Sequence, residues 1–228
     1  YFPFDEGSGD TLTDESGGGY EGVIQGGVEW TDGKYGKALS FDGSSGYVEV
    51  ADDDGIDLDE SYTVMTWVYP TLVDGSYRWI IDKGHDNDTL NYLLGISAEN
   101  VFRFITSNLA NDIKLGDSIT AESWYHIAGV QDTENNEVLL YVNGSVAGNV
   151  ELAGEAVIND ASLRIGCREW QGNIEQFFGG IVDEVAIFNT ALTETEVQES
   201  MQGIESPVTA VNPSRSIIIT WSKIKTEY

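Results

Sequence analysis

Short runs of alternating apolar and polar residues recur along this chain, and glycines separate them. In the segment YTVMTWVYP, Val64, Thr66 and Val68 share one face, and Met65 and Trp67 share the other. A period of two is the pattern of a β-strand, whose side chains alternate between two sides. Similar runs are ALSFDG, GYVEVA, RWIIDKG, NYLLGIS, VFRFITS, WYHIAGVQD, EVLLYVNG, ASLRIGC and GIVDEVAIF. The pattern therefore predicts about ten short strands.

The turns between these runs favour antiparallel pairing. The chain holds 26 glycines but only 4 prolines, which suits tight turns between strands. Asn143 and Gly144 stand between the apolar runs EVLLYV and SVAGNVEL, and both residues tolerate the positive φ of a type I′ hairpin turn. Many strands and very little helix predict an all-β fold in which two antiparallel sheets pack as a sandwich.

One short helix is predicted after the last strand. Thr193 and Glu196 have the spacing of a capping box, in which each residue satisfies a backbone N–H of the other. Leu192 and Val197 stand where a hydrophobic staple would join the two sides of the helix start. We expect a structural helix over roughly residues 194–202.

The charge of the chain narrows its possible partners. Hydrophobic residues make up 41% of the sequence, which is enough to build a core. Lysine and arginine number 11 against 39 aspartates and glutamates, for a formal charge of -28. Such a surface repels phosphate backbones and anionic lipids, so we expect no nucleic-acid partner and no membrane-surface binding.

The sequence contains fewer signals for the cellular location of the protein than for its fold. No apolar run approaches the length of a membrane span, and Cys167 is the single cysteine, so no intramolecular disulfide forms. The chain opens directly on YFPFDEGSGD, which resembles the first strand of a domain whose leader is absent. We expect a secreted or cell-surface protein whose isolated domain is a monomer.

Several motifs resemble those of a known family. The opening FDEGSGDTLTDESGGGYEGVIQGGVEWTDGKYGKALSFDGSSGYVEV is similar to that of the bacterial laminin-G-like jelly-roll domains of the concanavalin A-like lectin/glucanase superfamily. YTVMTWVYP, WYHIAGVQDTENNEVLLYVNGSVAG and GIVDEVAIFNTALTETEV resemble later strands of that family in the same order. The resemblance implies a jelly-roll sandwich over residues 1–203, with one concave and one convex sheet. Residues 204–228 would be a C-terminal extension, docked or flexible.

Asp183 and Glu184 interrupt the apolar run GGIVDEVAIF, and catalysis is one explanation for them. A glycosidase needs two carboxyl groups that face each other across a sugar. Consecutive strand residues point to opposite faces, so we expect these two carboxylates to diverge. The alternating acidic pattern of the superfamily's glucanases is absent from this strand. The sequence therefore predicts no catalytic residues and a protein that is not an enzyme.

A structural calcium ion is the second explanation. The resemblance implies a Ca²⁺ site that joins the N-terminal segment, an early loop and the start of the last strand, which here correspond to Asp5, Asp42 with Gly46, and Asp183. Carboxylate and carbonyl oxygens are the ligands that Ca²⁺ accepts. The alternative is that Asp183 is a solvated residue at the start of a strand, and we expect Glu184 to be exposed or hydrogen-bonded.

A carbohydrate site would need aromatic faces to stack on sugar C–H groups, with polar side chains around them. The predicted ligand-binding residues, taken from two segments rich in both types, are Trp79, Tyr92, Arg103, Arg168 and Trp170. The alternatives are that Trp170 covers an edge of the sandwich and that Arg103 pairs with a carboxylate. His85, in the polar loop DKGHDNDT, is either an exposed loop residue or a contact for a ligand or second calcium ion.

These observations favour a calcium-stabilised, non-catalytic recognition module that binds a polysaccharide or glycan on its concave sheet or rim loops. A protein-interaction or cell-adhesion module is the first alternative. A glycoside hydrolase or polysaccharide lyase is the second, because the same fold hosts all of these functions.

Overall fold

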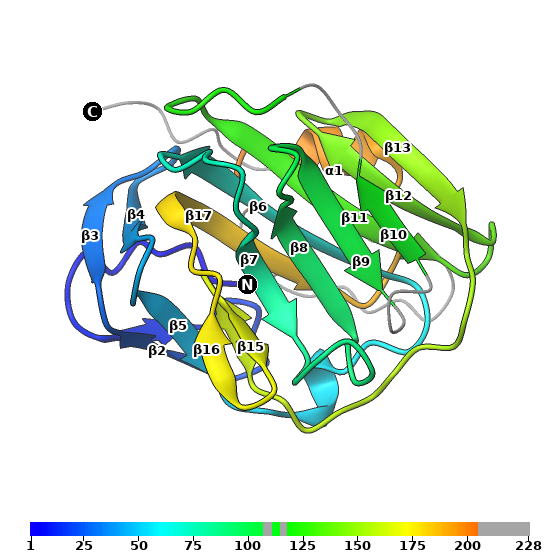
Figure 1. The fold of residues 1–228 in the computed structure, drawn as a ribbon, viewed down its shortest axis with the longest axis horizontal. Helices are drawn as coiled ribbons and strands as arrows, with labels where there is room; N and C mark the ends of the chain where they lie inside the picture. Colours follow the sequence, from blue (N-terminus) through cyan, green and yellow to red (C-terminus); the bar gives the residue numbers. More distant parts are fainter. Residues whose placement is uncertain (107–110, 115–117, 205–228) are drawn as a thin grey trace.

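A computed structural model describes residues 1–106, 111–114 and 118–204 of the chain. Figure 1 shows two large antiparallel sheets packed face to face, with the eight-stranded sheet in front. The eight-stranded sheet has the order β1 (Thr11–Thr13), β2 (Glu21–Gln25), β5 (Tyr47–Val50), β14 (Leu163–Ile165), β7 (Arg78–Lys83), β8 (Tyr92–Ile96), β9 (Phe102–Thr106) and β10 (Asn111–Lys114). The seven-stranded sheet has the order β13 (Ser145–Glu151), β12 (Glu137–Val142), β11 (Tyr125–Asp132), β6 (Tyr62–Pro70), β17 (Gly179–Phe188), β4 (Lys37–Asp42) and β3 (Val28–Asp32).

The strand order confirms the predicted sandwich. β5 pairs with β14, and β6 pairs with β11 and β17, so strands far apart in the sequence lie side by side. Such crossings between two antiparallel sheets are typical of a jelly roll. The predicted C-terminal extension lies outside the described residues, apart from Ile204. None of the described helices is long and apolar enough to cross a membrane.

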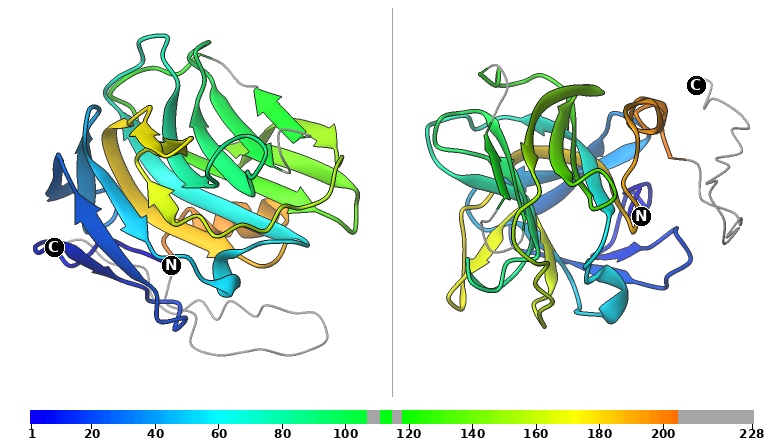
Figure 2. Two further views of the ribbon diagram at one scale, coloured as in Figure 1. Left: turned by 60° about the horizontal axis from the view of Figure 1, so that its bottom comes forward. Right: turned by 90° about the vertical axis from the view of Figure 1, so that its right-hand side faces the viewer.

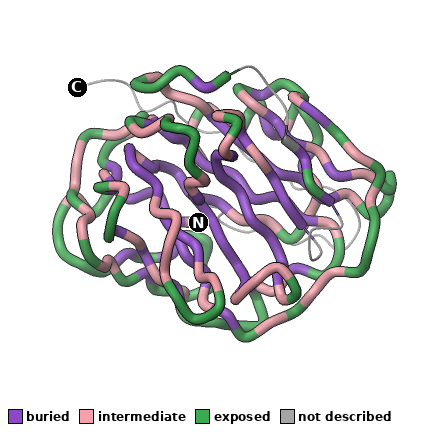
Figure 3. Tube along the Cα trace, in the orientation of Figure 1, coloured by how far each residue is buried: buried purple, intermediate pink, exposed green. Residues whose placement is uncertain are grey.

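The main core lies between the two sheets, where buried strands from both sheets meet (Figure 3). Two smaller apolar clusters lie on the outer faces. Met65, Ala128 and Ala186 pack beneath the helix α1 (Glu194–Ser200) on the seven-stranded sheet. On the eight-stranded sheet, Trp79 packs with Leu93 and neighbouring residues near the hairpin β15 (Arg168–Trp170) and β16 (Asn173–Glu175). Figure 2 shows α1 and this hairpin on opposite sides of the sandwich.

The local signals for the helix and the hairpin turn are confirmed. The Thr193 hydroxyl accepts the Glu196 N–H at 3.4 Å, and the Glu196 carboxylate accepts the Thr193 N–H at 2.8 Å. Leu192 is buried in the apolar cluster beneath α1. Asn143 and Gly144 have φ values of 52° and 75°, as the predicted turn requires. A short 3₁₀ helix (Asp54–Ile56) follows β5.

Candidate functional site

A β-bulge in β17 changes the direction of the two carboxylates. The register with β6 shifts between Asp183 and Ala186, and Glu184 has a φ of 53°. Val182 and Val185 both point into the core, although residues three apart on a regular strand face opposite ways. The bulge thus places Asp183 and Glu184 together on the outer face. Both charges act on Tyr35: burial is the main cause of its raised pKa, and the two carboxylates raise the pKa further. The expectation that the two carboxylates diverge is wrong.

Asp183 is fully buried, and only one of its two carboxylate oxygens accepts hydrogen bonds from the described residues. Its Oδ2 atom accepts the N–H groups of Lys34 and Tyr35 at 2.8 and 3.0 Å, while its Oδ1 atom is buried and has no hydrogen-bond partner among the described residues. Burial, with a smaller contribution from the Glu184 charge, raises the pKa of Asp183 to about 7. A solvated aspartate would show none of these features. A buried carboxylate oxygen without a partner costs free energy, and a cation at that oxygen would lower the cost.

Asp5 contacts the same turn as Asp183. Its Oδ1 atom accepts the Lys37 N–H at 2.9 Å, and a Cβ atom on Gly36 would lie only 1.9 Å from that oxygen. The β3–β4 turn therefore contacts two carboxylates, one from the N-terminal segment and one from β17. Their hard oxygen atoms fit the donor chemistry of Ca²⁺.

Asp42 and Gly46 do not join this pair. Both Asp42 oxygens accept hydrogen bonds from its own turn, from Ser44, Ser45 and the Gly46 N–H. Burial acts to raise the pKa of Asp42, but these hydrogen bonds outweigh it and hold the pKa well below the usual range. Asp42 pairs with Gly179, which is four strand residues, or about 13 Å, from Asp183.

The prediction that these four residues form one calcium site is therefore wrong. Asp42 and Gly46 lie at one end of β4, and Asp5 and Asp183 lie near its other end. Within the described part of the chain, no group of three or more histidine, cysteine, aspartate and glutamate side chains is arranged to hold a metal ion.

Four of the five predicted ligand-binding residues do come together, on the outer face of the eight-stranded sheet. Trp79 stacks on Tyr77 with ring centroids 5.8 Å apart. The Arg103 guanidinium lies 5.7 Å from the Trp79 ring, and that of Arg168 lies 5.9 Å from Trp79 and 4.5 Å from Trp170. We call these five residues the arginine–aromatic patch.

Gly95 on β8 makes room for this arrangement. It pairs with Trp79 on one side and Arg103 on the other. A Cβ atom at Gly95 would lie 2.6 Å from the Trp79 ring. The absent side chain therefore lets the indole lie against the sheet between its two neighbours.

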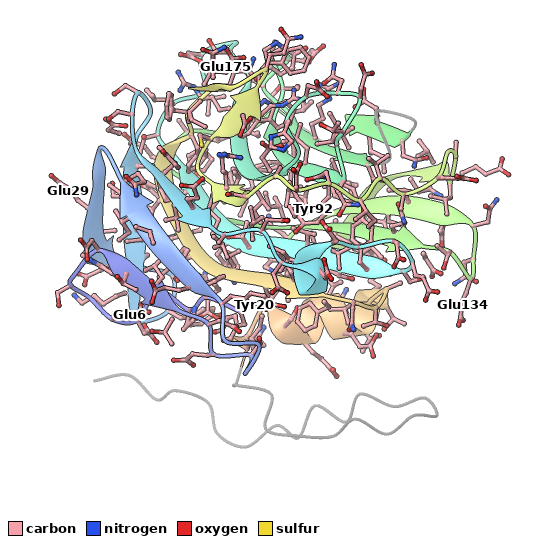
Figure 4. The ribbon with its side chains drawn as sticks, turned by 90° about the horizontal axis from the view of Figure 1, so that it is seen from below. Glu6, Tyr20, Glu29, Tyr92, Glu134 and Glu175 are labelled. Carbon is pink, nitrogen blue, oxygen red and sulfur yellow. The ribbon has the colours of Figure 1, made fainter. Side chains whose placement is uncertain are left out.

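Tyr92 is a correction to the predicted set. Its side chain lies in the core between the sheets, and its hydroxyl donates to the Ile56 carbonyl at 3.1 Å (Figure 4). Its neighbour Leu93 faces outward instead. Trp79 is only 1% exposed, so it supports the patch from beneath, while Tyr77 and Trp170 are half-buried and reach the surface.

The cations of the patch are held by polar neighbours. Arg103 donates to both carboxylate oxygens of Asp112 at 2.8 and 2.7 Å, which agrees with the predicted alternative of a carboxylate pair. Arg168 donates to Asn87 at 2.7 Å. Asp82 accepts the Glu169 N–H at 3.0 Å, and burial raises the pKa of Asp82 to about 7, against the opposing charge of Arg168. The donors of the patch are thus fixed before any ligand arrives.

The predicted ligand-binding set left out Tyr77, and the sequence did not reveal the partners of His85. Tyr77 lies just before the strand and carries no alternation signal. His85 contacts Glu169 and Asp160, which are 84 and 75 residues away along the chain. Only the fold brings these residues together. The predicted alternative that His85 is a plain loop residue is therefore incomplete, because it has specific partners.

A cavity of about 420 Å³ lies elsewhere, at one end of the sandwich. Its lining includes Tyr1, Tyr20, Ile56 and Phe188, and none of the described residues that line it has a charged side chain. It shares no residue with the arginine–aromatic patch.

The sequence of the chain matches the model of one protein family. A family model described as the concanavalin A-like lectin/glucanases superfamily matches residues 42–198. The match covers more than half of the chain, so this protein belongs to that superfamily, as its motifs predicted. No curated protein sequence matches the chain.

Solved structures share the fold at low sequence identity. The binding domain of Paraclostridial Mosquitocidal Protein 1 is 17% identical, with a TM-score of 0.67 over 88% of this chain and 52% of that one. Domain 4 of AbnA, a GH43 extracellular arabinanase from Geobacillus stearothermophilus in complex with arabinotriose, is 22% identical, with a TM-score of 0.60 over 78% of this chain and 86% of that one. The binding domain of botulinum neurotoxin DC, in complex with rat synaptotagmin II, is 16% identical, with a TM-score of 0.67 over 87% and 51%. This chain spans about half the length of the mosquitocidal-protein and neurotoxin binding domains.

Proposed function

We propose that this domain is a non-catalytic carbohydrate-binding module of an extracellular protein and that the arginine–aromatic patch is its ligand surface. The observation that carries the proposal is the convergence of Tyr77, Arg103, Arg168 and Trp170 above the buried Trp79. The arabinotriose complex of a domain with the same fold supports this class of ligand.

The chemistry of the patch suits a sugar ring. The half-buried Trp170 offers an aromatic face for sugar C–H groups, and Tyr77 offers a second ring beside it. The two guanidinium groups carry N–H donors for hydroxyl oxygens. Because Asp112 and Asn87 already orient these groups, less conformational entropy is lost when the ligand binds.

The test is binding to a panel of polysaccharides that includes arabinan, with arabinotriose as a small probe, measured by calorimetry. We expect Trp170→Ala to weaken binding about tenfold or more, which is on the order of 1.5 kcal/mol. Tyr69→Ala is the matched control, because Tyr69 is a half-buried aromatic residue on the seven-stranded sheet.

Each result would separate the candidate functions. Equal loss in both variants would contradict the arginine–aromatic patch as the ligand surface. No carbohydrate binding by the folded protein would contradict the whole proposal and favour a protein-interaction module. Release of shorter saccharides during the assay would instead mark an enzyme.

A structural calcium ion is the second part of the proposal. Asp183 and Asp5 would hold it beside the β3–β4 turn, with the unpartnered Oδ1 atom of Asp183 as the main ligand. The ion would supply positive charge to a buried carboxylate and would join the N-terminal segment to β17. It would stabilise the folded form only, since these groups meet only there.

A further inference from the structure

The hairpin β15–β16 is fastened to the sheet through His85. The Nδ1 atom of this residue lies 2.9 Å from Glu169 Oε1, and the Nε2 atom lies 3.0 Å from Asp160 Oδ1. The His85 carbonyl accepts the Gln171 N–H at 2.9 Å. One loop residue thus contacts the hairpin twice and the segment before β14 once.

The geometry defines the charge of this histidine. Ionised carboxylates only accept hydrogen bonds, so each ring nitrogen must donate a proton to make its contact. Only the imidazolium form has two N–H donors. The hydrogen bond to Glu169, and then that to Asp160, raises the pKa of His85 above its ordinary value, while partial burial acts in the opposite direction.

Other charges around His85 act on the same contacts. Asp86 is its neighbour in the loop, and its carboxylate lies near enough to interact with the imidazolium. Arg164 contacts the second oxygen of Glu169 at 2.6 Å, so this carboxylate stays between two cations. The His85 side chain is 36% exposed, and water therefore weakens these interactions.

The same contacts determine where two patch residues lie. Glu169 stands between Arg168 and Trp170 on β15, so its contact with His85 anchors the strand that carries both. Arg168 also donates to Asn87, two residues after His85. Loss of the imidazolium would release one carboxylate and loosen the support under both patch residues.

We infer that protonated His85 is a positioning residue of the ligand patch, which holds Arg168 and Trp170 in place and makes binding weaken as pH rises through the His85 pKa. The binding part of this inference rests on the proposed function, and the hairpin part does not. The sign follows from linkage: a raised folded-state pKa contributes stability that is complete below the unfolded value of about 6.5 and is lost as pH rises through the folded value.

NMR titration of the imidazole C–H groups tests the hairpin part. The chain has two histidines, and burial lowers the pKa of the other, His126, to about 4, so the two signals separate. Asp160→Asn keeps an accepting oxygen but removes the negative charge at a side chain that is 94% exposed. We expect a His85 pKa above 6.5 that falls in Asp160→Asn. The Arg168 and Gln171 amides should shift with the same midpoint.

His85→Gln separates this effect from the titration of Asp82, whose pKa burial raises to about 7. In His85→Gln, the hairpin amides should lose the pH-dependent shift whose midpoint equals the His85 pKa. A His85 pKa at or below 6.5, or hairpin amides that keep this step in His85→Gln, would overturn the inference.

The binding part is measured as the affinity for arabinotriose, or for the polysaccharide that the panel identifies, across the same pH range. The wild-type affinity should fall several-fold above the His85 pKa, while that of His85→Gln should stay flat apart from any Asp82 step. Parallel profiles in the two proteins would contradict this part. If nothing binds at any pH, the proposed function fails, and the NMR result alone decides the role of His85 in the hairpin.

Discussion

Individual side chains in this protein are directed by their strand and by the residue opposite them. Leu93 faces outward and Tyr92 faces the core, although they are neighbours in a nearly uninterrupted apolar run. Such a run is buried on both faces, so its sequence does not reveal which residues reach the surface. Asp42 is different, because the serines that follow it are a local signal for a turn closed by its own side chain.

Asp183 is the residue at which calcium binding is most directly tested. Asp183→Asn keeps an oxygen for the Lys34 and Tyr35 N–H groups but removes the charge that a cation needs. Calcium at a hundredfold excess over its Kd should stabilise the wild type by about 2.7 kcal/mol and should leave Asp183→Asn unchanged. Asp42→Asn is the control and should keep the calcium response. Thermal unfolding with calcium and with a chelator measures this, and equal responses in the wild type and Asp183→Asn would refute the site.

The elements differ in how much of their structure is local. The helix α1 follows from its capping box and staple, which lie within a few residues of each other. The bulge of β17 has no such signal, because it depends on how Phe2 pairs with Val185 and how β6 pairs on the other side. The patch lies between these cases: its residue types were visible in the sequence, but their contacts depend on strand order.

The capping box gives a prediction at this scale. Thr193→Ala removes the acceptor for the Glu196 N–H at the helix start. We expect the free energy of unfolding to fall by about 1 kcal/mol, as is usual for a lost N-cap. Urea unfolding measures it, with Thr120→Ala at an exposed loop position as the control. A loss no larger than that of the control would show that packing of Leu192 and Val197 alone holds the helix.

In the molecule as a whole, different elements pack on the outer faces of the two sheets. The seven-stranded sheet is covered in part by α1 and carries the buried Asp183, while the eight-stranded sheet carries the hairpin and the arginine–aromatic patch (Figure 2). The four arginines of the described residues are all on the eight-stranded sheet or its hairpin, which concentrates hydrogen-bond donors there in an otherwise acidic protein. The composition predicts an acidic protein. It does not predict where the arginines lie, because their positions follow from the strand order.

A map of backbone amide shifts by NMR, recorded as arabinotriose or a short oligosaccharide from the polysaccharide panel is added, locates the carbohydrate-binding surface directly. We predict that the shifts gather in β7, β8, β9 and the hairpin β15–β16, with Trp170 and Arg103 among them. Shifts confined to the cavity beside Tyr20 and Phe188, or to the face that carries α1, would contradict the account.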